Sequence, residues 1–431
     1  MAVPPKHVAI VGGGIAGLAT AYALHARAAA AGIRLTCSVI EAAREWGGKI
    51  ATHAIGGLVI EAGPDSFLSQ KPWALELCRQ LGLGDQVINT NPLEEKAFVY
   101  SRGRLRPLPE GLVMIVPTKL APLLRSGLLS WSGMARMAMD LVIPRARETN
   151  EDESLASFFR RRLGQEAFER LIEPLMAGIY AGDAERLSLR ATFPKFVQME
   201  REHGSLIRGL VAGRAAKREA DGTGADPRTM FVTLRDGLHT LTGALVADLE
   251  KTGTRMRLGQ RVTALRARPA STGEPAYALS CGDGPLVAAD AVVLATPAYV
   301  SAELVRELSA EGADLLTAIP YASTATVSLA YNRAELGPSV RGFGFVVPRV
   351  EHRDLLAATW TSRKWSHRAP SSQGLVRCYV GGIGRDAILT ADDHMLAQRV
   401  RHELKEIAGV TATPTYVEVN RWDRGMPQYT V

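Results

Sequence analysis

The stretch Val8-Ala9-Ile10-Val11-Gly12-Gly13-Gly14-Ile15-Ala16-Gly17-Leu18 decides the fold of this chain. An apolar run leads directly into a Gly-x-Gly-x-x-Gly pattern, and a helix-forming stretch from Leu18 to Arg27 follows at once. Gly12 permits a tight turn, Gly14 lets the backbone approach a pyrophosphate, and Gly17 lets the helix pack closely on the strand. We therefore predict a strand–helix unit that binds a dinucleotide, with its phosphates at the N-terminus of the helix, at Gly13, Ile15 and Ala16.

A second predicted strand, Leu35 to Ile40, ends at Glu41, where an acid can accept hydrogen bonds from an adenosine ribose. The residues after Glu41 bear on whether the dinucleotide is FAD or NAD. Ala42 is followed by a pair of glycines and a lysine, Gly47-Gly48-Lys49, and then by Glu61-Ala62-Gly63-Pro64-Asp65-Ser66. The combined pattern resembles the flavoproteins that include amine oxidases, phytoene desaturases and porphyrinogen oxidases. This resemblance implies FAD, and it implies a Rossmann-like FAD-binding domain of the GR2 type.

Composition narrows the possible partners. The chain has 431 residues, is 46% hydrophobic and carries a net charge of +7. A basic balance suits an acidic substrate or an anionic membrane surface, although an ordinary basic surface explains it equally well. We expect no nucleic-acid binding, because no basic run is interleaved with stacking aromatics. The N-terminus has no apolar signal core and no stretch is long enough to span a membrane, which predicts a cytoplasmic protein, peripheral to the membrane at most.

The cysteines give no indication of a metal site. They form no Cys-x-x-Cys pair, and no cluster of His, Asp and Glu suggests a metal either, so we expect none. Widely separated cysteines suit a reducing compartment. The four are Cys37, Cys78, Cys281 and Cys378.

The pattern along the chain predicts an α/β protein with a discontinuous FAD-binding domain, in residues 1–95 and 230–304. Residues 96–210 are expected to form a hairpin, at 97–100 and 104–107, and a helical lobe over a substrate channel. Residues 305–420 are expected to form a substrate domain on a mixed sheet. Residues 421–431 would begin a C-terminal FAD-binding segment.

Two segments of the middle region stand out. Residues 118–147 are apolar and basic, and contain Trp131. This composition suits contact with a membrane interface, the mouth of a substrate channel, or an ordinary helical lobe with a basic outer face. Residues 212–228 are charged and nearly free of large apolar side chains, which predicts a mobile loop.

A more specific resemblance rests on the stretch Phe168 to Asp183, which contains Glu173-Pro174 and Gly178-Ile179-Tyr180-Ala181-Gly182-Asp183. It is similar to the porphyrinogen oxidases of haem biosynthesis. Further matches run in the same order along the whole chain, among them Gly342 to Pro348, Val380-Gly381-Gly382 and Trp422. The resemblance implies an enzyme that oxidises a porphyrinogen to a porphyrin, with six electrons passing in three rounds to oxygen as peroxide.

The resemblance also implies roles for individual residues. Gly12, Gly14, Gly17, Glu41, Gly47, Gly48, Lys49 and Gly63 to Ser66 match FAD-binding positions. The backbone of Val262 would meet the adenine, and Trp422 marks a further cofactor position. The substrate would meet Gly178, an apolar wall at Val346, a stacking ring at Tyr379 and a propionate partner at Lys71. No catalytic acid or base is apparent.

The chain departs from the family pattern in two places. Plant-type relatives carry an arginine where this chain has Ala97, with Lys96 beside it, so a propionate anchor there has changed or moved. The chain ends at Val431, where the family continues with a segment that touches the flavin. A C-terminally shortened protein, including an inactive fragment that binds porphyrin, is therefore one expectation.

Coproporphyrinogen III is the expected substrate. Lys71, Lys364-Trp365 and His367-Arg368-Ala369-Pro370 look more like the soluble coproporphyrinogen-oxidising members. Protoporphyrinogen IX is the first alternative, and an amine oxidase or desaturase activity is the second. Partners that the resemblance implies are O2 and another enzyme of the haem pathway.

Overall fold

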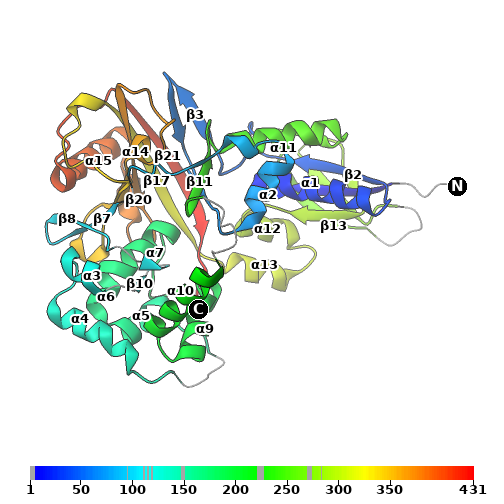
Figure 1. Ribbon diagram of the computed structural model, residues 1–431. Helices are drawn as coiled ribbons and strands as arrows, with labels where there is room; N and C mark the ends of the chain where they lie inside the picture. The colour runs from blue at the N-terminus through cyan, green and yellow to red at the C-terminus, as the bar shows by residue number, and fades with distance from the viewer. Residues whose placement is uncertain are drawn as a thin grey trace. The chain divides into compact units, whose positions relative to one another are not determined.

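The computed structural model describes residues 5–94, 96–109, 112–113, 116–117, 120–146, 151–220, 228–268, 274–282 and 284–431. The chain divides into two compact units (Figure 1). The first unit comprises Met1–Asn89 and Arg228–Ile319, and the second comprises Thr90–Pro227 and Pro320–Val431. Each unit therefore combines segments that are far apart in the sequence.

A four-stranded parallel sheet forms the centre of the first unit, in the order β12-β2-β1-β16. Alternate residues of β1 face opposite sides, as the pleat requires. Val8 and Ile10 pack with Leu18 of α1 and Leu245 of α11, whereas Ala9 and Val11 pack against a second sheet, β13-β14-β15. These elements are β1 (Lys6–Val11), α1 (Ile15–Ala30), β2 (Leu35–Ile40), α11 (His239–Lys251), β12 (Arg255–Arg257), β13 (Val262–Ala267), β14 (Tyr277–Cys281), β15 (Val287–Ala289) and β16 (Ala291–Leu294).

Smaller elements complete the first unit. A hairpin pairs β3 with β4, and a three-stranded sheet has the order β5-β11-β6. Their bounds, with those of the remaining helices, are β3 (Thr52–Ile55), β4 (Leu58–Glu61), β5 (Phe67–Leu68), α2 (Pro72–Gln80), η1 (Gly84–Gln86), β6 (Val87–Asn89), β11 (Phe231–Leu234), α12 (Ala298–Val305) and α13 (Ala310–Thr317).

A seven-stranded mixed sheet forms the second unit's core, in the order β21-β17-β20-β19-β18-β7-β8. All neighbours are antiparallel except β18 and β7. One face packs on α15 and the other on the helical lobe. The elements are β7 (Ala97–Ser101), β8 (Arg104–Pro107), β17 (Tyr321–Asn332), η4 (Arg333–Glu335), β18 (Gly344–Val346), η5 (Arg349–Glu351), β19 (Leu355–Thr359), α14 (Thr361–Lys364), β20 (Gln373–Gly381), η6 (Asp386–Thr390), α15 (Asp393–Ala408) and β21 (Tyr416–Pro427).

The helical lobe buries an apolar cluster that includes Phe158, Phe159 and Phe196. A buried ion pair lies within it: Arg162 and Asp140 are both 0% exposed. The lobe contains β9 (Leu112–Val113), β10 (Val116–Pro117), α3 (Leu120–Ser126), α4 (Trp131–Ala138), η2 (Met139–Leu141), α5 (Leu155–Leu163), α6 (Gln165–Ala167), the π-helix η3 (Phe168–Ile172), α7 (Glu173–Tyr180), α8 (Leu189–Thr192), α9 (Pro194–His203) and α10 (Leu206–Ala220).

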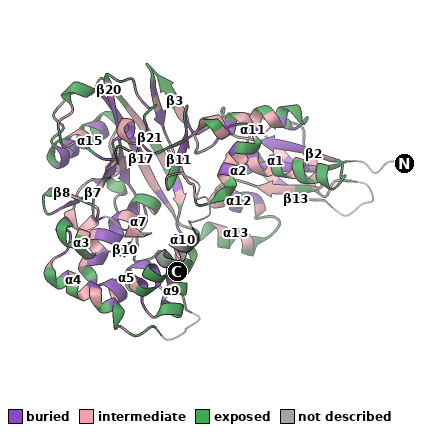
Figure 2. Ribbon diagram, viewed as in Figure 1, coloured by how far each residue is buried: buried purple, intermediate pink, exposed green. Residues whose placement is uncertain are grey.

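Burial follows the expected layering. Figure 2 shows buried residues concentrated in the strands of the sheets and exposed residues on the outer sides of the helices. In the parts of the chain that are described, no helix is long and apolar enough to cross a membrane.

One expectation about the elements was wrong, and others differ in context. The predicted mobile loop at 212–228 is helical as far as Ala220, because α10 continues there; its alanine, arginine, lysine and glutamate residues favour a helix without forming an apolar stripe. Residues 221–227 lie outside the described residues. The predicted hairpin is present, but β7 pairs with β18 in the seven-stranded sheet. The domain boundaries expected at 304 and 421 stay predictions; the first compact unit extends to Ile319, and residue 421 lies within β21.

Candidate functional site

The loop between β1 and α1 forms a close-packed turn. Gly12 has a φ of +109°, and a Cβ there would lie 2.8 Å from the carbonyl oxygen of Ala295. A Cβ on Gly17 would overlap the carbonyl oxygen of Gly12, so the start of α1 lies directly against the turn. Both positions therefore require glycine, for reasons of conformation and of space.

Gly14 is different, because it has room beside it. A Cβ there would meet nothing closer than the Gly47 carbonyl oxygen at 3.8 Å. Gly14 is the N-cap of α1, no side chain caps the helix, and its first turn contains no acid. The first N–H groups of a helix have no partner inside it, and Ile15 and Ala16 carry two of them at a partly accessible position. The open space, the free N–H groups and the helix dipole fit a pyrophosphate.

Glu41 holds the ends of the loop together. Its carboxylate accepts hydrogen bonds from the backbone N–H of Gly13 (2.6 Å) and of Ala43 (2.7 Å). Each oxygen keeps a second lone pair, which leaves acceptor capacity for ribose hydroxyls. Glu41 is therefore also a structural residue of the turn, a role that sequence reasoning missed. Ala42, which lies between Glu41 and Ala43 in the sequence, is exposed.

The second pair of glycines lies beside the first loop. Gly14 and Gly47 form a parallel bridge, and the N–H of Gly47 donates to the carbonyl of Gly13 (3.0 Å). Lys49 follows on the surface. A Cβ on Gly13 would overlap the Trp46 ring, so this tryptophan packs across the loop. Trp46 is thus a further residue of the cradle, although its sequence position gave no signal for that contact.

The residues just before Val262 bond to the segment that contains Glu41, and so bring Val262 close to it. The N–H of Gln260 donates to the carbonyl of Glu41, and the N–H of Gly259 donates to that of Ala43, both at 2.8 Å. These bonds bring the start of β13 next to Glu41 at the end of β2. The structure thus brings Gly12 to Gly17, Glu41, Gly47, Gly48 and Val262 into one cradle.

The remaining first-unit residues lie further along the chain. Gly63, Pro64, Asp65 and Ser66 form the connection between β4 and β5, in which the Ser66 hydroxyl donates to Asp65 (2.6 Å). Lys71 is an exposed residue at the N-cap of α2.

Trp422 belongs to β21 of the second unit, so it is not part of the cradle that the first unit forms by itself. It lies at the start of a bulge, where Arg424 has a φ of +44° and residues 423–425 lie opposite Ser323. Bulges often redirect a side chain beside a functional site.

Three expected substrate residues come together in the second unit. Val346 and Tyr379 both pair with Ala357, from opposite sides, so the three lie in one row across the sheet. A Cβ on Gly178 of α7 would lie 3.9 Å from Val346 Cγ1. The half-buried Tyr379 ring, the Val346 side chain and the bare Gly178 backbone therefore share one face of the sheet.

The neighbouring row on the same face carries a cation. Ala97, Gly344, Thr359 and Arg377 pair in sequence across four strands. The guanidinium of Arg377 lies 5.0 Å from the centre of the Tyr379 ring, and Arg377 is 3% exposed. Ala97 leaves its end of the row without a cation. Arg377 was missed because pairing across the sheet cannot be derived from its local sequence.

The C-terminal end of α7 is fixed by polar contacts. The Gln428 amide donates to the carbonyl of Tyr180 (3.0 Å), and the N–H of Ile383 donates to that of Ala181 (2.9 Å). At the other end, burial raises the pKa of Glu173, whose carboxyl accepts from the N–H of Arg349 (3.0 Å). These contacts hold Gly178 against the sheet. Among the described residues, no group of three or more His, Cys, Asp or Glu side chains could hold a metal ion.

The parallel sheet, the glycine cradle and the acid at the end of β2 are the features of a dinucleotide-binding flavoprotein fold. The family model for the flavin containing amine oxidoreductases matches residues 15–431, and the chain belongs to this family. The expected fold class and the expected FAD cofactor are thereby confirmed.

The chain is similar over its whole length to named relatives. It is 38% identical to the coproporphyrinogen III oxidase of Bacillus subtilis (strain 168), over 99% of this chain and 88% of that protein. The corresponding enzyme of Staphylococcus aureus is 33% identical, over 99% of this chain and 89% of the relative. The chloroplastic protoporphyrinogen oxidase 1 of Arabidopsis thaliana is 31% identical, over 98% and 78%.

Solved structures agree with this result. A crystal structure from Exiguobacterium sp. 255-15, provisionally named a protoporphyrinogen oxidase, has a TM-score of 0.85 and 33% identity, covering 100% of this chain and 89% of that one. A putrescine oxidase matches with a TM-score of 0.68 and 16% identity, covering 99% of this chain and 89% of that one, which shows the fold alone.

Proposed function

We propose that this chain oxidises coproporphyrinogen III to coproporphyrin III with FAD and O2. The observation that carries this proposal is the face of the second unit where Gly178, Val346 and Tyr379 meet, in a chain 38% identical to a coproporphyrinogen III oxidase. The balanced reaction consumes three O2 per porphyrinogen and yields three H2O2. Bound FAD supplies a two-electron acceptor, so the six-electron oxidation takes three rounds.

The residues of this chain bind and orient. Gly12 to Gly17, Glu41, Gly47 and Gly48 would hold the dinucleotide, and Val262 would meet the adenine. On the other unit, a macrocycle would lie with one edge on the backbone of Gly178, where a side chain would obstruct it. Val346 would form an apolar wall and Tyr379 a stacking ring, an arrangement that aromatic side chains favour at about 0.5–1.5 kcal/mol per pair.

The substrate's propionates need cations. Lys71 remains the proposed partner from the first unit. Arg377 lies buried next to Tyr379, and its position over the ring supports the orientation of that ring. A tetra-anionic coproporphyrinogen gains more from a cation such as Lys71 than protoporphyrinogen IX, which has two propionates. The relatives named coproporphyrinogen III oxidase, at 38% and 33% identity, support the same choice over the Arabidopsis relative at 31%.

Aerobic turnover tests the proposal. Purified, FAD-loaded protein should convert coproporphyrinogen III into fluorescent coproporphyrin III with a kcat/KM at least tenfold above that for protoporphyrinogen IX. Peroxide should appear at three equivalents per porphyrin. A preference for protoporphyrinogen IX would assign the alternative substrate, and no turnover of either would refute the proposal.

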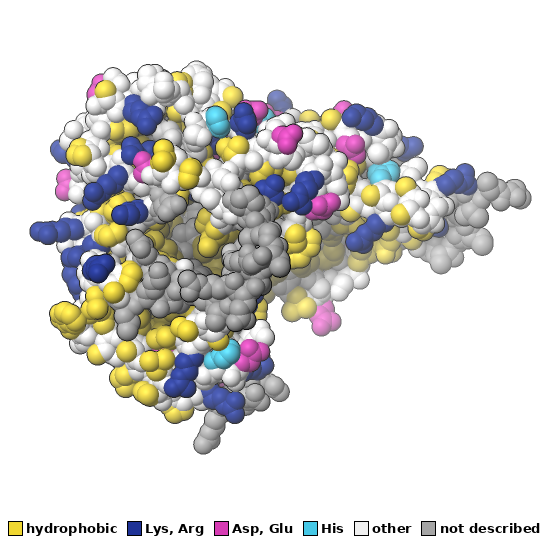
Figure 3. All heavy atoms as spheres, viewed as in Figure 1, with side chains coloured by type: hydrophobic (Ala, Val, Ile, Leu, Met, Phe, Trp, Pro, Cys, Tyr) yellow, Lys and Arg dark blue, Asp and Glu magenta, His cyan; other side chains and the backbone are white. Residues whose placement is uncertain are grey.

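We also propose that the protein contacts membranes peripherally through residues 120–142. Five large apolar side chains of this segment are exposed, with Trp131 at 80% and Val142 at 74%; the others are Leu124, Met139 and Leu141. Figure 3 shows apolar side chains gathered over α3 and α4, with Lys and Arg side chains nearby. An apolar tip beside basic groups suits an anionic bilayer surface.

Co-sedimentation with vesicles of anionic phospholipid tests this contact. We expect binding that the double substitution of Trp131→Ser and Val142→Ser abolishes while turnover of the soluble substrate persists. A control, Leu315→Ser, removes an apolar side chain of similar exposure, 67%, from α13 of the first unit. Binding that survives the double substitution would refute the contact.

A further inference from the structure

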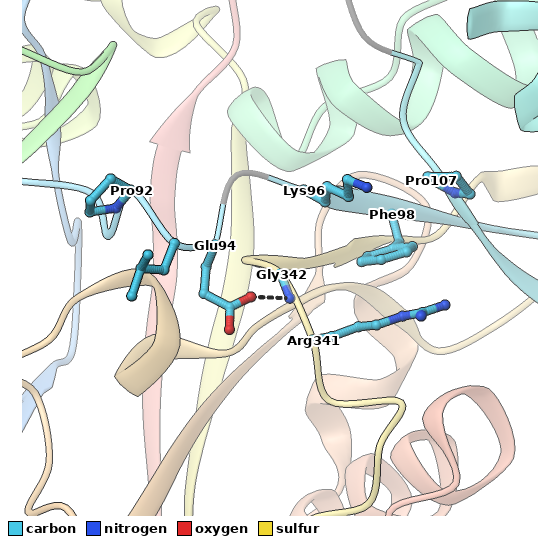
Figure 4. Close-up of a pocket in the computed structure, with 8 residues that line it drawn as sticks. Pro92, Glu94, Lys96, Phe98, Pro107, Arg341 and Gly342 are labelled. Carbon is cyan, nitrogen blue, oxygen red and sulfur yellow. Dashed lines mark hydrogen bonds between the residues drawn. The ribbon is translucent and has the colours of Figure 1, made fainter.

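A cavity lies in the second unit, at the start of β7. Its volume is about 490 Å³, within the range of small-molecule sites. Phe98 forms part of its lining, and Pro92, Leu93 and Pro107 add apolar walls (Figure 4). Leu93 is 90% exposed, so the cavity offers an apolar surface that solvent now covers.

The cavity is on the opposite side of β7 from the proposed substrate residues. Phe98 packs in the cluster that includes α15, whereas the next residue, Val99, packs with the helical lobe. Val99 pairs with Val346, and Phe98 pairs with Phe345. Because successive side chains of a strand point to opposite faces, this cavity and the Gly178–Val346–Tyr379 face are separate places.

Two cations line one end of the cavity. Lys96 and Arg341 come from adjacent chain segments, which are joined where the N–H of Phe343 donates to the carbonyl of Lys96 (2.7 Å). Figure 4 shows their charged ends on either side of Phe98, pointing the same way. The Arg341 guanidinium lies 5.5 Å from the centre of the Phe98 ring. Within the described ranges, neither side chain has an ion pair.

The acid that lines the cavity does not neutralise them. Glu94 points to the other end, where it accepts from the N–H of Gly342 (2.7 Å) and pairs with Arg363. Its charge is thus compensated locally. Among the described residues, the cavity therefore presents two positive charges without an ion-pair partner, on either side of an aromatic ring and next to an apolar wall.

We propose that this cavity is a second binding site, for an aromatic ligand that carries carboxylates. The Arg341 fork can hold a carboxylate in two hydrogen bonds, Lys96 provides a point charge for another, and the apolar walls accept the ring. The porphyrin made at the first site belongs to this chemical class and is supplied by the protein's own reaction. The inference rests on the proposed function only for this choice of ligand.

Calorimetric titration of the FAD-loaded protein with coproporphyrin III tests the site. We expect two equivalents to bind to the native protein. Lys96→Ala combined with Arg341→Ala should remove one equivalent, or weaken it more than tenfold, and leave kcat unchanged. The control Arg399→Ala with Lys405→Ala removes two exposed cations from α15 and should still bind two equivalents.

Two results would overturn the inference. In the first, the native protein binds only one equivalent of coproporphyrin III, and the Lys96/Arg341 variant still binds it. The other is a variant that binds two equivalents as the native protein does. The titration needs no turnover, so a protein that fails to oxidise porphyrinogen still reports on this cavity. A Tyr379→Ala variant, which affects the other equivalent, separates the two sites.

Discussion

Replacing Gly14 with alanine should separate FAD binding from the stability of the apoprotein. A Cβ at Gly14 has no neighbour closer than 3.8 Å, and the φ of −73° suits alanine. The same Cβ would extend into the open space beside the helix N-terminus, where the pyrophosphate is proposed to approach. The substitution should therefore leave the free protein intact and obstruct its cofactor.

The size of the effect follows from the contacts at stake. A methyl group that pushes a phosphate oxygen away from backbone N–H groups weakens hydrogen bonds to a charged acceptor, worth about 1.5–3 kcal/mol. That corresponds to a Kd for FAD raised about tenfold to a hundredfold. Two small effects act on the free energy of unfolding of the apoprotein. Alanine is a poorer N-cap than glycine, whereas alanine makes the unfolded chain less flexible; each effect is below about 1 kcal/mol, and they oppose each other.

The assay compares three variants. Apoprotein of Gly14→Ala, Gly17→Ala and Gly243→Ala is titrated with FAD by fluorescence quenching, and its Tm is measured without FAD. Gly17→Ala should lower the Tm of the apoprotein, because its Cβ would overlap the Gly12 carbonyl. Gly243→Ala lies on α11, and a Cβ there would have nothing within 4 Å. This substitution should leave the Kd for FAD unchanged and should not lower the Tm of the apoprotein.

The reasoning would be refuted by Gly14→Ala binding FAD as tightly as the native protein with an unchanged Tm. It would equally be refuted if Gly14→Ala lowered the apoprotein Tm as much as Gly17→Ala. In either case, the space beside Gly14 would not be the approach to the phosphates.

Three further predictions concern other parts of the molecule. Tyr379→Ala should raise the KM for porphyrinogen about threefold to tenfold by removing the stacking ring, whereas Tyr379→Phe should leave it unchanged. Arg162→Met should destabilise the protein by about 3–5 kcal/mol in urea unfolding, because it leaves Asp140 buried and unpaired. Burial lowers the pKa of His7 below its ordinary value of 6.5, so the unfolded chain takes up the proton more readily. The free energy of unfolding should thus fall as the pH drops below about 6.5, and His7→Gln should reduce that fall.

Each of these predictions has a control. Tyr379→Ala that raised KM for both porphyrinogens without changing affinity for the product would contradict stacking. Arg266→Met breaks an exposed ion pair with Glu307 and should cost less than about 1 kcal/mol; an equal loss at Arg162 would contradict the burial argument. His394 is exposed and serves as the control for His7. If His394→Gln reduced the loss of unfolding free energy at low pH as much as His7→Gln does, that loss could not be assigned to His7.

The local signals in the sequence predicted much of the first unit. The Gly12–Gly17 loop, the helix after it and the Leu35–Ile40 strand are present, because each is specified by a short run of neighbouring residues. Glu41 lies where the pattern placed it, but its bonds to Gly13 and Ala43 could not be read from spacing. Such bonds depend on how two segments meet in space.

The second unit shows where local reading fails. The hairpin at 97–107 was predicted, yet its partner β18 begins at Gly344, so the seven-stranded sheet joins segments that no local pattern connects. Arg377 beside Tyr379 depends on the same pairing. The helix through Ala220 was missed because a helix was predicted only where apolar residues form a stripe. This segment has no such stripe, and its residues favour a helix through their intrinsic propensity.

An anaerobic visible spectrum, recorded while coproporphyrinogen III is added to the FAD-loaded protein, tests the central claim most directly. We predict that the oxidised-flavin absorption falls as porphyrin absorption grows, and that O2 then restores the flavin band. A flavin band that stays constant while porphyrinogen remains colourless would contradict the account.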